Sequence, residues 1–285
     1  MRLYTVEVNG KEQVAVEVKE GLMSLADLGI EVSDMNDLIL RYEEIESMLL
    51  EKINNSSNVV IKDYKVLAPV PVPMQDIVCL GVNYKEHIDE TAKVVDFTKK
   101  EDAVYFSKRV NRSNNPDGVI PVYDFVDSLD YEVELGVILK KDAFQVSVDD
   151  AKNYILGYTI INDVSARNIQ LKHQQWYRGK SLDGYTPMGP CIVTADEIED
   201  VYNLSIECYV NGEQRQRSNT ACMITKIEEA ISELSQGMTL KAGTIIATGT
   251  PGGVAMGMKP PKFLQKGDTV RCVIENIGEI VNKVG

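Results

Sequence analysis

The chain after residue 74 is a succession of short β-rich runs, and this feature constrains the fold more than any other. The runs are separated by Gly, Asn, Asp and Pro, which is typical of strands joined by turns. They lie at residues 77–84, 131–139, 154–163, 190–194, 204–212, 243–250 and 268–278. Helical segments are few, the clearest at 148–156, behind a Ser147/Asp150 capping box, and at 226–236. Because strands and helices do not alternate strictly, we predict a mainly β, α+β fold and disfavour a doubly wound sheet.

The chain before residue 74 predicts a separate small unit. Residues 3–18 alternate apolar and polar side chains on both sides of Asn9-Gly10, the strongest short-range signal for a β-hairpin. Residues 37–53 carry apolar side chains at helical spacing, which predicts an amphipathic helix. Alternating prolines within residues 68–73 fix an extended backbone that makes a natural boundary. We therefore predict a small N-terminal α+β domain over residues 1–66, a Pro-rich linker over 67–73 and a main domain over 74–285.

The chain has 43 acidic and 30 basic residues and a formal charge of -13, which opposes binding to nucleic acid and to anionic membranes. A site for an anionic substrate therefore needs a local cation, whether Lys, Arg or a bound metal. The N-terminus lacks the apolar core of a signal peptide, and no apolar stretch is long enough to span a membrane. The five cysteines are far apart and predict reduced thiols. We expect a cytoplasmic protein that binds neither nucleic acid nor membrane.

Three acidic residues stand in or at the end of two β-rich runs. Because side chains of a strand alternate between its faces, Glu132 and Glu134 share one face. Taken alone, this pair is more typical of a solvated strand face than of a site. Asp163 follows an apolar strand, where it could cap the next turn or project into a site. Carboxylate oxygens are the ligands that Mg²⁺, Mn²⁺ and Ca²⁺ prefer, so the three residues together predict a metal site.

His87 and Glu90 form a second candidate group. If the segment after Tyr84 is helical, the spacing of three residues places Glu90 beside His87, where it can orient the imidazole for work as a general base. A weak surface ion pair is the alternative interpretation. His173 is the other histidine of the chain, and its polar surroundings predict a solvated side chain.

Two cations and a glycine-rich loop complete the candidate residues. Lys180 and Arg167 are near the acidic residues in sequence, and each could hold a substrate carboxylate or stabilise an enolate. Ordinary surface charges are the alternative. Residues 248–254 follow an apolar strand, and their small side chains would let the backbone and the Thr250 hydroxyl approach a ligand. A tight turn without a ligand is the alternative for this loop.

Taken in order, these segments resemble the fumarylacetoacetate hydrolase family. Its members carry an N-Y-x-x-H-x-x-E segment, a D-Y-E-x-E-L strand, an N-D-x-S-A-R-x-x-Q segment, a K-S-x-D-x-x-x-P-x-G-P segment and a T-G-T-P-x-G-V loop. Here they stand at residues 83–90, 130–135, 162–170, 180–190 and 248–254, and a Gln265-Lys266-Gly267-Asp268 turn follows. The chain departs from the family at Ile88, where Ala is usual, and at residues 106–109, which resemble an F-x-K-P pattern without its proline.

The resemblance implies a β-roll catalytic domain of the α+β class, usually in a homodimer, with a small N-terminal domain in the longer bacterial members. It implies Mg²⁺ or Mn²⁺ as the cofactor, which Ca²⁺ could replace in a crystal. By motif position it also implies roles for individual residues: Glu132, Glu134 and Asp163 as metal ligands, His87 and Glu90 as a catalytic dyad on a lid, Lys180 as a catalytic residue, and Arg167, Gln170 and Thr250 as substrate contacts.

The function that the resemblance implies is hydrolysis of a C–C bond in a 2,4-dioxo acid such as an acylpyruvate or fumarylacetoacetate. A metal-stabilised enolate would form, with help from Lys180 and Thr250, while His87 activates the attacking water. Without attacking water the same site could only move a proton or lose CO₂. An oxaloacetate tautomerase or decarboxylase and a 5-carboxymethyl-2-hydroxymuconate-type isomerase are therefore alternatives. Outside enzymes, the alternative is a binding protein that keeps the fold and its metal for stability.

Overall fold

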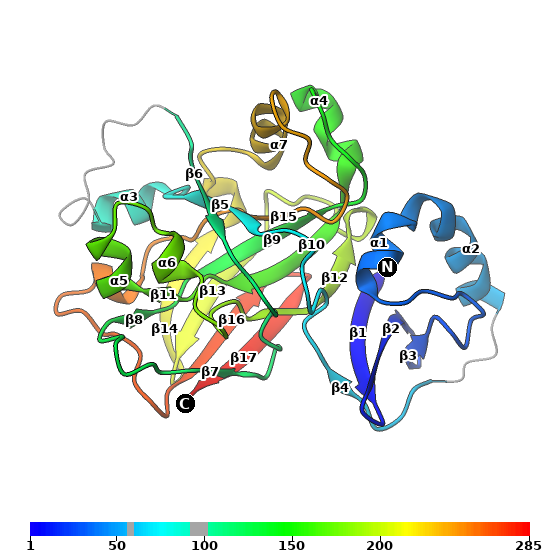
Figure 1. Cartoon of the computed structure of the whole chain (residues 1–285), viewed down its shortest axis with the longest axis horizontal. Helices are drawn as coiled ribbons and strands as arrows, with labels where there is room; N and C mark the ends of the chain where they lie inside the picture. The colour runs from blue at the N-terminus through cyan, green and yellow to red at the C-terminus, as the bar shows by residue number, and fades with distance from the viewer. Residues whose placement is uncertain (56–59, 92–101) are drawn as a thin grey trace.

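The structure, a computed structural model, describes residues 1–55, 60–91 and 102–285 (Figure 1). The strands are β1 (Arg2–Val8), β2 (Lys11–Val18), β3 (Gly21–Ser24), β4 (Lys65–Val66), β5 (Ile77–Gly81), β6 (Val104–Lys108), β7 (Val119–Ile120), β8 (Leu129–Asp130), β9 (Val133–Leu139), β10 (Ile155–Asn162), β11 (Ser165–Ala166), β12 (Met188–Thr194), β13 (Ser205–Val210), β14 (Glu213–Asn219), β15 (Ile245–Ala247), β16 (Thr269–Ile274) and β17 (Gly278–Val284). The α-helices are α1 (Met35–Leu40), α2 (Tyr42–Asn55), α3 (Lys85–Thr91), α4 (Val148–Ala151), α5 (Arg167–Lys172), α6 (Tyr177–Lys180) and α7 (Ile227–Ser235). Strands predominate over helices in these residues, which confirms the predicted α+β, mainly β fold.

A ten-stranded sheet in the order β3-β2-β1-β12-β10-β9-β15-β5-β6, with β4 paired to β1, forms the centre of the molecule. β9 and β10 are antiparallel neighbours in its interior, and every residue of both strands is buried. Their nearly continuous apolar sequences suit strands that are covered on both faces. A charged side chain at the ends of these strands is therefore held away from bulk water.

A five-stranded sheet in the order β14-β13-β16-β17-β7, yellow to red in Figure 1 except for β7, shares a hydrophobic core with β9 and β10. Val133, Leu135 and Val137 of β9 belong to this core, together with Ile206 and Cys208 of β13. Ile138 of β9 points to the opposite face and belongs to a second core, which also contains residues of α1 and α2. The large sheet is thus packed between the small sheet and the N-terminal helices.

The first three strands extend the large sheet. β1 and β2 form the predicted hairpin, and its turn residues Asn9 and Gly10 have φ values of 51° and 75°, as the Asn-Gly pair favours. β1 also pairs antiparallel with β12, so this small N-terminal sheet region is continuous with the strands that follow residue 74. The boundary at residues 67–73 stays a prediction.

Most of the predicted helices form with shifted ends. The segment predicted over residues 37–53 is two helices, α1 and α2, because the backbone leaves the helical region at Arg41. The Ser147 side chain caps α4 as predicted, but the α-helix ends at Ala151 and a 3₁₀ turn leads directly into β10. No helix in the described part of the chain has the length and apolar character to cross a membrane.

Candidate metal centre

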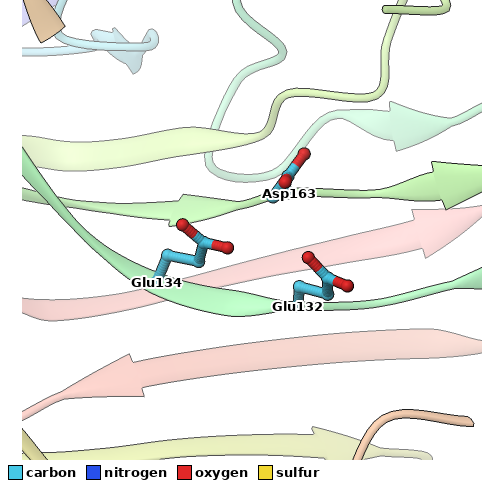
Figure 2. A group of neighbouring side chains, drawn as sticks. All are labelled: Glu132, Glu134 and Asp163. Atoms are coloured by element: carbon cyan, nitrogen blue, oxygen red, sulfur yellow. The ribbon is translucent and has the colours of Figure 1, made fainter. Parts of the chain in front are cut away.

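Three carboxylates meet where β9 and β10 pair. Glu134 lies in β9, Glu132 directly precedes it and Asp163 directly follows β10. Glu134 stands opposite Ile161, and the Asp163 amide donates to the Glu132 carbonyl at 2.8 Å. The side chains converge in Figure 2, and one oxygen atom from each lies within 4.8 Å of the others. Because the three residues are 4%, 2% and 0% exposed in the order Glu132, Glu134 and Asp163, the interpretation as a solvated strand face is wrong.

Two buried lysines contact these carboxylates. Lys180 Nζ donates to Glu132 Oε2 at 2.6 Å and to Asp163 Oδ2 at 2.7 Å. Lys108 Nζ donates to Asp163 Oδ1 at 2.6 Å and to two backbone carbonyls. Burial lowers the pKa of Lys180, but Asp163 and Glu132 outweigh it and raise the pKa above its usual value. Lys180 is therefore a charged donor, and the interpretation as a surface charge is wrong.

Arg167 contacts a fourth carboxylate, that of Asp130, as well as Glu132. Its Nε donates to Asp130 Oδ2 at 2.8 Å, and its Nη2 lies 2.6 Å from Glu132 Oε1. Its Nη1 donates to Gln170 Oε1 at 2.9 Å. Arg167 is 2% exposed, so its interpretation as a surface charge is also wrong. The guanidinium fixes the position of Glu132 and of the Gln170 amide at the same time.

The electrostatics of the cluster fit a bound cation at Glu134. Burial raises the pKa of Glu134 well above its usual value, and Asp163 and Glu132 raise it further. Glu132 differs, because Lys180 and Arg167 outweigh the effect of burial and lower its pKa to about 2. In the described part of the chain Glu134 accepts a hydrogen bond from the Gly249 amide alone, at 2.8 Å. A divalent ion among these oxygen ligands would supply the positive charge that the Glu134 carboxylate lacks.

His87 and Glu90 lie on α3, as the motif predicts. His87 Nδ1 is 2.9 Å from Glu90 Oε1, and His87 is 6% exposed. Glu90 Oε2 accepts from the Gly253 amide at 2.7 Å, which attaches the dyad to the loop at residues 248–254. The interpretation as a weak surface pair is wrong, because the imidazole is buried and its carboxylate partner is held from both sides.

An open cavity of about 480 Å³ joins the carboxylates to α3. Predicted site residues line one part of it: His87, Glu132, Glu134, Arg167, Gln170, Lys180 and Thr250. Apolar side chains line the remainder, namely Leu80, Val82, Phe106, Leu171, Trp176 and Met256. Asp163 and Glu90 stand directly behind this lining, bonded to Lys180 and His87. The fold thus brings all the predicted site residues to one cavity, whereas His173 is exposed.

Sequence reasoning missed three buried polar residues around the site. Lys108 lies in the F-x-K-x segment noted above, and Asp130 begins the D-Y-E-x-E-L strand, so both carried a signal within a motif. Gln216 carried none. It is 0% exposed on β14, and its Nε2 donates to Thr250 Oγ1 at 2.7 Å. None of the three lines the cavity, and each instead bonds a predicted site residue: Lys108 bonds Asp163, Asp130 bonds Arg167 and Gln216 bonds Thr250.

The fold and the site together define an α+β protein with a buried carboxylate cluster suited to a divalent metal ion. A family model described as "Fumarylacetoacetate (FAA) hydrolase C-terminal" matches residues 76–285, and the chain belongs to this family.

Named relatives and solved structures agree with this membership. The chain is 41% identical to "Oxaloacetate tautomerase YisK" of Bacillus subtilis over 225 residues, which are 79% of this chain and 74% of that protein. A fumarylacetoacetate hydrolase from Exiguobacterium antarcticum superposes with a TM-score of 0.83 at 34% identity, covering 100% of this chain and 99% of that one. A maleylpyruvate hydrolase from Sphingobium sp. SYK-6, solved with manganese(II) and pyruvate, gives 0.78 at 26% identity, covering 100% and 98%.

Proposed function

We propose that this chain is a keto–enol tautomerase of oxaloacetate or a closely similar 2-oxo acid, with Mg²⁺ or Mn²⁺ held by Glu132, Glu134 and Asp163. The observation that carries the proposal is the buried carboxylate cluster that shares a cavity with the His87–Glu90 pair. The relative named as an oxaloacetate tautomerase supports this reaction over the hydrolysis that the motifs alone favour. The divalent ion would act as a Lewis acid that acidifies the carbon next to the 2-oxo group.

His87 carries out the proton transfer in this proposal. Glu90 bonds Nδ1, so the opposite ring nitrogen, Nε2, takes the proton from the carbon next to the 2-oxo group and delivers it to the 2-oxo oxygen to give the enol. The same transfer in reverse gives the keto acid. The carboxylate of Glu90 stabilises the imidazolium while the ring holds the proton. Since tautomerisation needs no water, burial of the imidazole protects the enol from side reactions.

Lys180 stabilises negative charge on the substrate. Two of its three N–H groups go to Glu132 and Asp163, and within residues 1–55, 60–91 and 102–285 the third has no hydrogen-bond partner. Lys180 lines the cavity, so this third donor can reach a substrate oxygen. Arg167 and the Gln170 amide stand beside it at the cavity wall and contribute to holding the substrate carboxylate.

Hydrolysis of an acylpyruvate-like 2,4-dioxo acid is the second candidate function. The apolar part of the cavity favours it, because Phe106, Trp176 and Leu171 could accommodate the tail of a longer substrate. His87 would then activate water rather than move a proton on carbon. The maleylpyruvate hydrolase of similar structure supports this candidate. A homodimer remains a prediction from the family, and a cytoplasmic location remains a prediction from the sequence.

One set of assays separates these functions. With Mg²⁺ present, a tautomerase accelerates the loss of the ultraviolet absorbance of enol-oxaloacetate without releasing pyruvate. A hydrolase releases pyruvate and a free acid from acylpyruvates, and a decarboxylase releases pyruvate and CO₂ from oxaloacetate. If Mg²⁺ raised the melting temperature while no 2-oxo acid was turned over or bound, the binding-protein alternative would replace both enzyme functions.

A further inference from the structure

Gln216 is a buried amide that joins the two sheets beside the proposed metal site. It lies on β14 of the five-stranded sheet, is 0% exposed, and bonds residues of the large sheet and of the loop at residues 248–254. Its Oε1 accepts from the Val133 amide at 3.1 Å. Its Nε2 donates to Thr250 Oγ1 at 2.7 Å and to the Pro251 carbonyl at 2.9 Å. Val133 stands between Glu132 and Glu134, so one side chain contacts both the ligand strand and the loop.

The orientation of this amide is fixed by its backbone partners. The Val133 amide can only donate and the Pro251 carbonyl can only accept, so Oε1 must face the former and Nε2 the latter. Thr250 Oγ1 therefore accepts a hydrogen from Gln216, and its own proton goes to the Val133 carbonyl at 2.9 Å. The Thr250 hydroxyl then has only a lone pair left for a ligand, which suits an enol hydroxyl better than the oxygen of an enolate.

The backbone confirms that the loop rests on β14 at this point. Gly253 has φ +105°, and a Cβ there would lie 1.9 Å from the Arg215 carbonyl oxygen. The amide of Gly249, in the same loop, donates to Glu134, and the Gly253 amide donates to Glu90. A shift of the loop relative to β14 would therefore move groups on both sides of the cavity.

We infer that Gln216 is a positioning residue, which holds the Thr250 loop against the strand of the metal ligands and sets the Thr250 hydroxyl as a hydrogen-bond acceptor. The inference rests on the function proposed above for this cavity. Gln216 acts through Val133 and Thr250, since its own side chain is not part of the cavity lining.

The test compares Gln216→Met with Asn282→Leu. Asn282 is a suitable control because it is another 0% exposed amide on the same small sheet, and its Nδ2 donates to two backbone carbonyls, of Asn115 and Gly118, at 2.9 Å each. Both substitutions remove buried hydrogen bonds with little change in volume, so both should lower the melting temperature. Only Gln216→Met should lower kcat, by about 10-fold to 10²-fold, and weaken Mn²⁺-dependent oxalate binding by about 10-fold, both measured against wild type.

Two further measurements decide between positioning and mere stability. If Gln216 acts through Thr250, then Gln216→Met combined with Thr250→Val should lose no more kcat than the worse single variant, whereas independent effects would multiply. Amide hydrogen exchange, which needs neither metal nor turnover, should increase at residues 248–254 and at Val133 in Gln216→Met but not in Asn282→Leu. Unchanged exchange there, or multiplicative losses, would overturn the inference. Loss of the proposed function alone would appear as an inactive wild type whose exchange still responds to Gln216→Met.

Discussion

The cavity has two walls that are built differently. The strand wall consists of Glu132 and Glu134, with Asp163 directly behind them and Lys180 of α6 bonded to Glu132 and Asp163. Its carboxylates are placed by the pairing of β9 with β10. The helix wall consists of His87 and Glu90 on the seven-residue helix α3. Exposure follows this difference: the Asp163 side chain is 0% exposed, whereas that of Glu90 is 18% exposed.

The loop at residues 248–254 is the element that contacts both walls. The Gly249 amide donates to Glu134 on the strand wall, and the Gly253 amide donates to Glu90 on the helix wall. Backbone pairing can set the ligand geometry without this loop, but the dyad depends on it for one partner of Glu90. We therefore expect the strand wall to govern metal binding and the helix wall to govern proton transfer, with the loop setting the distance between them.

The largest expected effect follows from removing a ligand on the strand wall. Glu134→Ala should reduce turnover by more than about 10⁴-fold, because the site would no longer bind the metal. This fall is larger than the fall expected from the loss of a general base. The melting temperature without metal should not fall, since Glu134 is buried beside like charges, but the rise on adding Mg²⁺ should disappear. Kinetics and thermal unfolding with and without Mg²⁺ test this, with the exposed Glu279→Ala as control. Full activity in a chelator would refute the metal role.

A change on the helix wall should affect chemistry without affecting the metal. His87→Gln should lower kcat by about 10²-fold to 10⁴-fold, as expected for a general acid–base, and leave the Mg²⁺ midpoint of thermal stabilisation unchanged. His173→Gln is the matched control, because His173 is exposed on the surface. A shifted Mg²⁺ midpoint in His87→Gln would show that the two walls are not functionally separate.

The two buried lysines beside the carboxylates of the strand wall have different roles. All three donors of Lys108 are used, by Asp163 and the carbonyls of Val164 and Tyr185, whereas Lys180 lines the cavity. Lys180→Met should lower kcat by about 10²-fold to 10³-fold, as loss of a donor to a developing oxyanion does. Both substitutions leave buried acceptors unpaired and should lower stability by about 3–5 kcal/mol, but Lys108→Met should lower kcat far less than Lys180→Met. Measuring kcat and denaturant unfolding for both variants would reveal whether this division is reversed.

The smallest expected effect tests the loop that joins the walls. Gly253→Ala would push a Cβ against the Arg215 carbonyl, so we expect a loss of stability of about 1–3 kcal/mol and a fall in kcat of about 10-fold. Gly10→Ala is the control, since Gly10 also has positive φ, at +75°, but a Cβ there meets nothing within 4 Å. It should lower stability by about 1–2 kcal/mol and leave kcat unchanged. Equal kcat in the two variants would mean that the loop does not set the distance between the walls.

Local patterns in the sequence predicted the local structure well. The Asn9-Gly10 hairpin, the Ser147 cap and helix α7 depend on interactions between residues close in the chain, and each forms as predicted. Strand alternation also predicted that Glu132 and Glu134 share a face. Where the prediction failed, at the break between α1 and α2, the backbone leaves the helical region at Arg41, although side chains of both helices belong to the same core.

The sequence by itself thus determined the strands, their turns and the order of the acidic, basic and imidazole side chains along the chain. Only the tertiary structure decided whether the strand face that carries Glu132 and Glu134 is solvent-exposed or buried, because burial depends on which strands flank β9. The contacts of Lys108 with Asp163, of Arg167 with Asp130 and of Gln216 with Val133 join residues 55, 37 and 83 positions apart. No local pattern encodes such contacts, since sheet topology alone brings those side chains together.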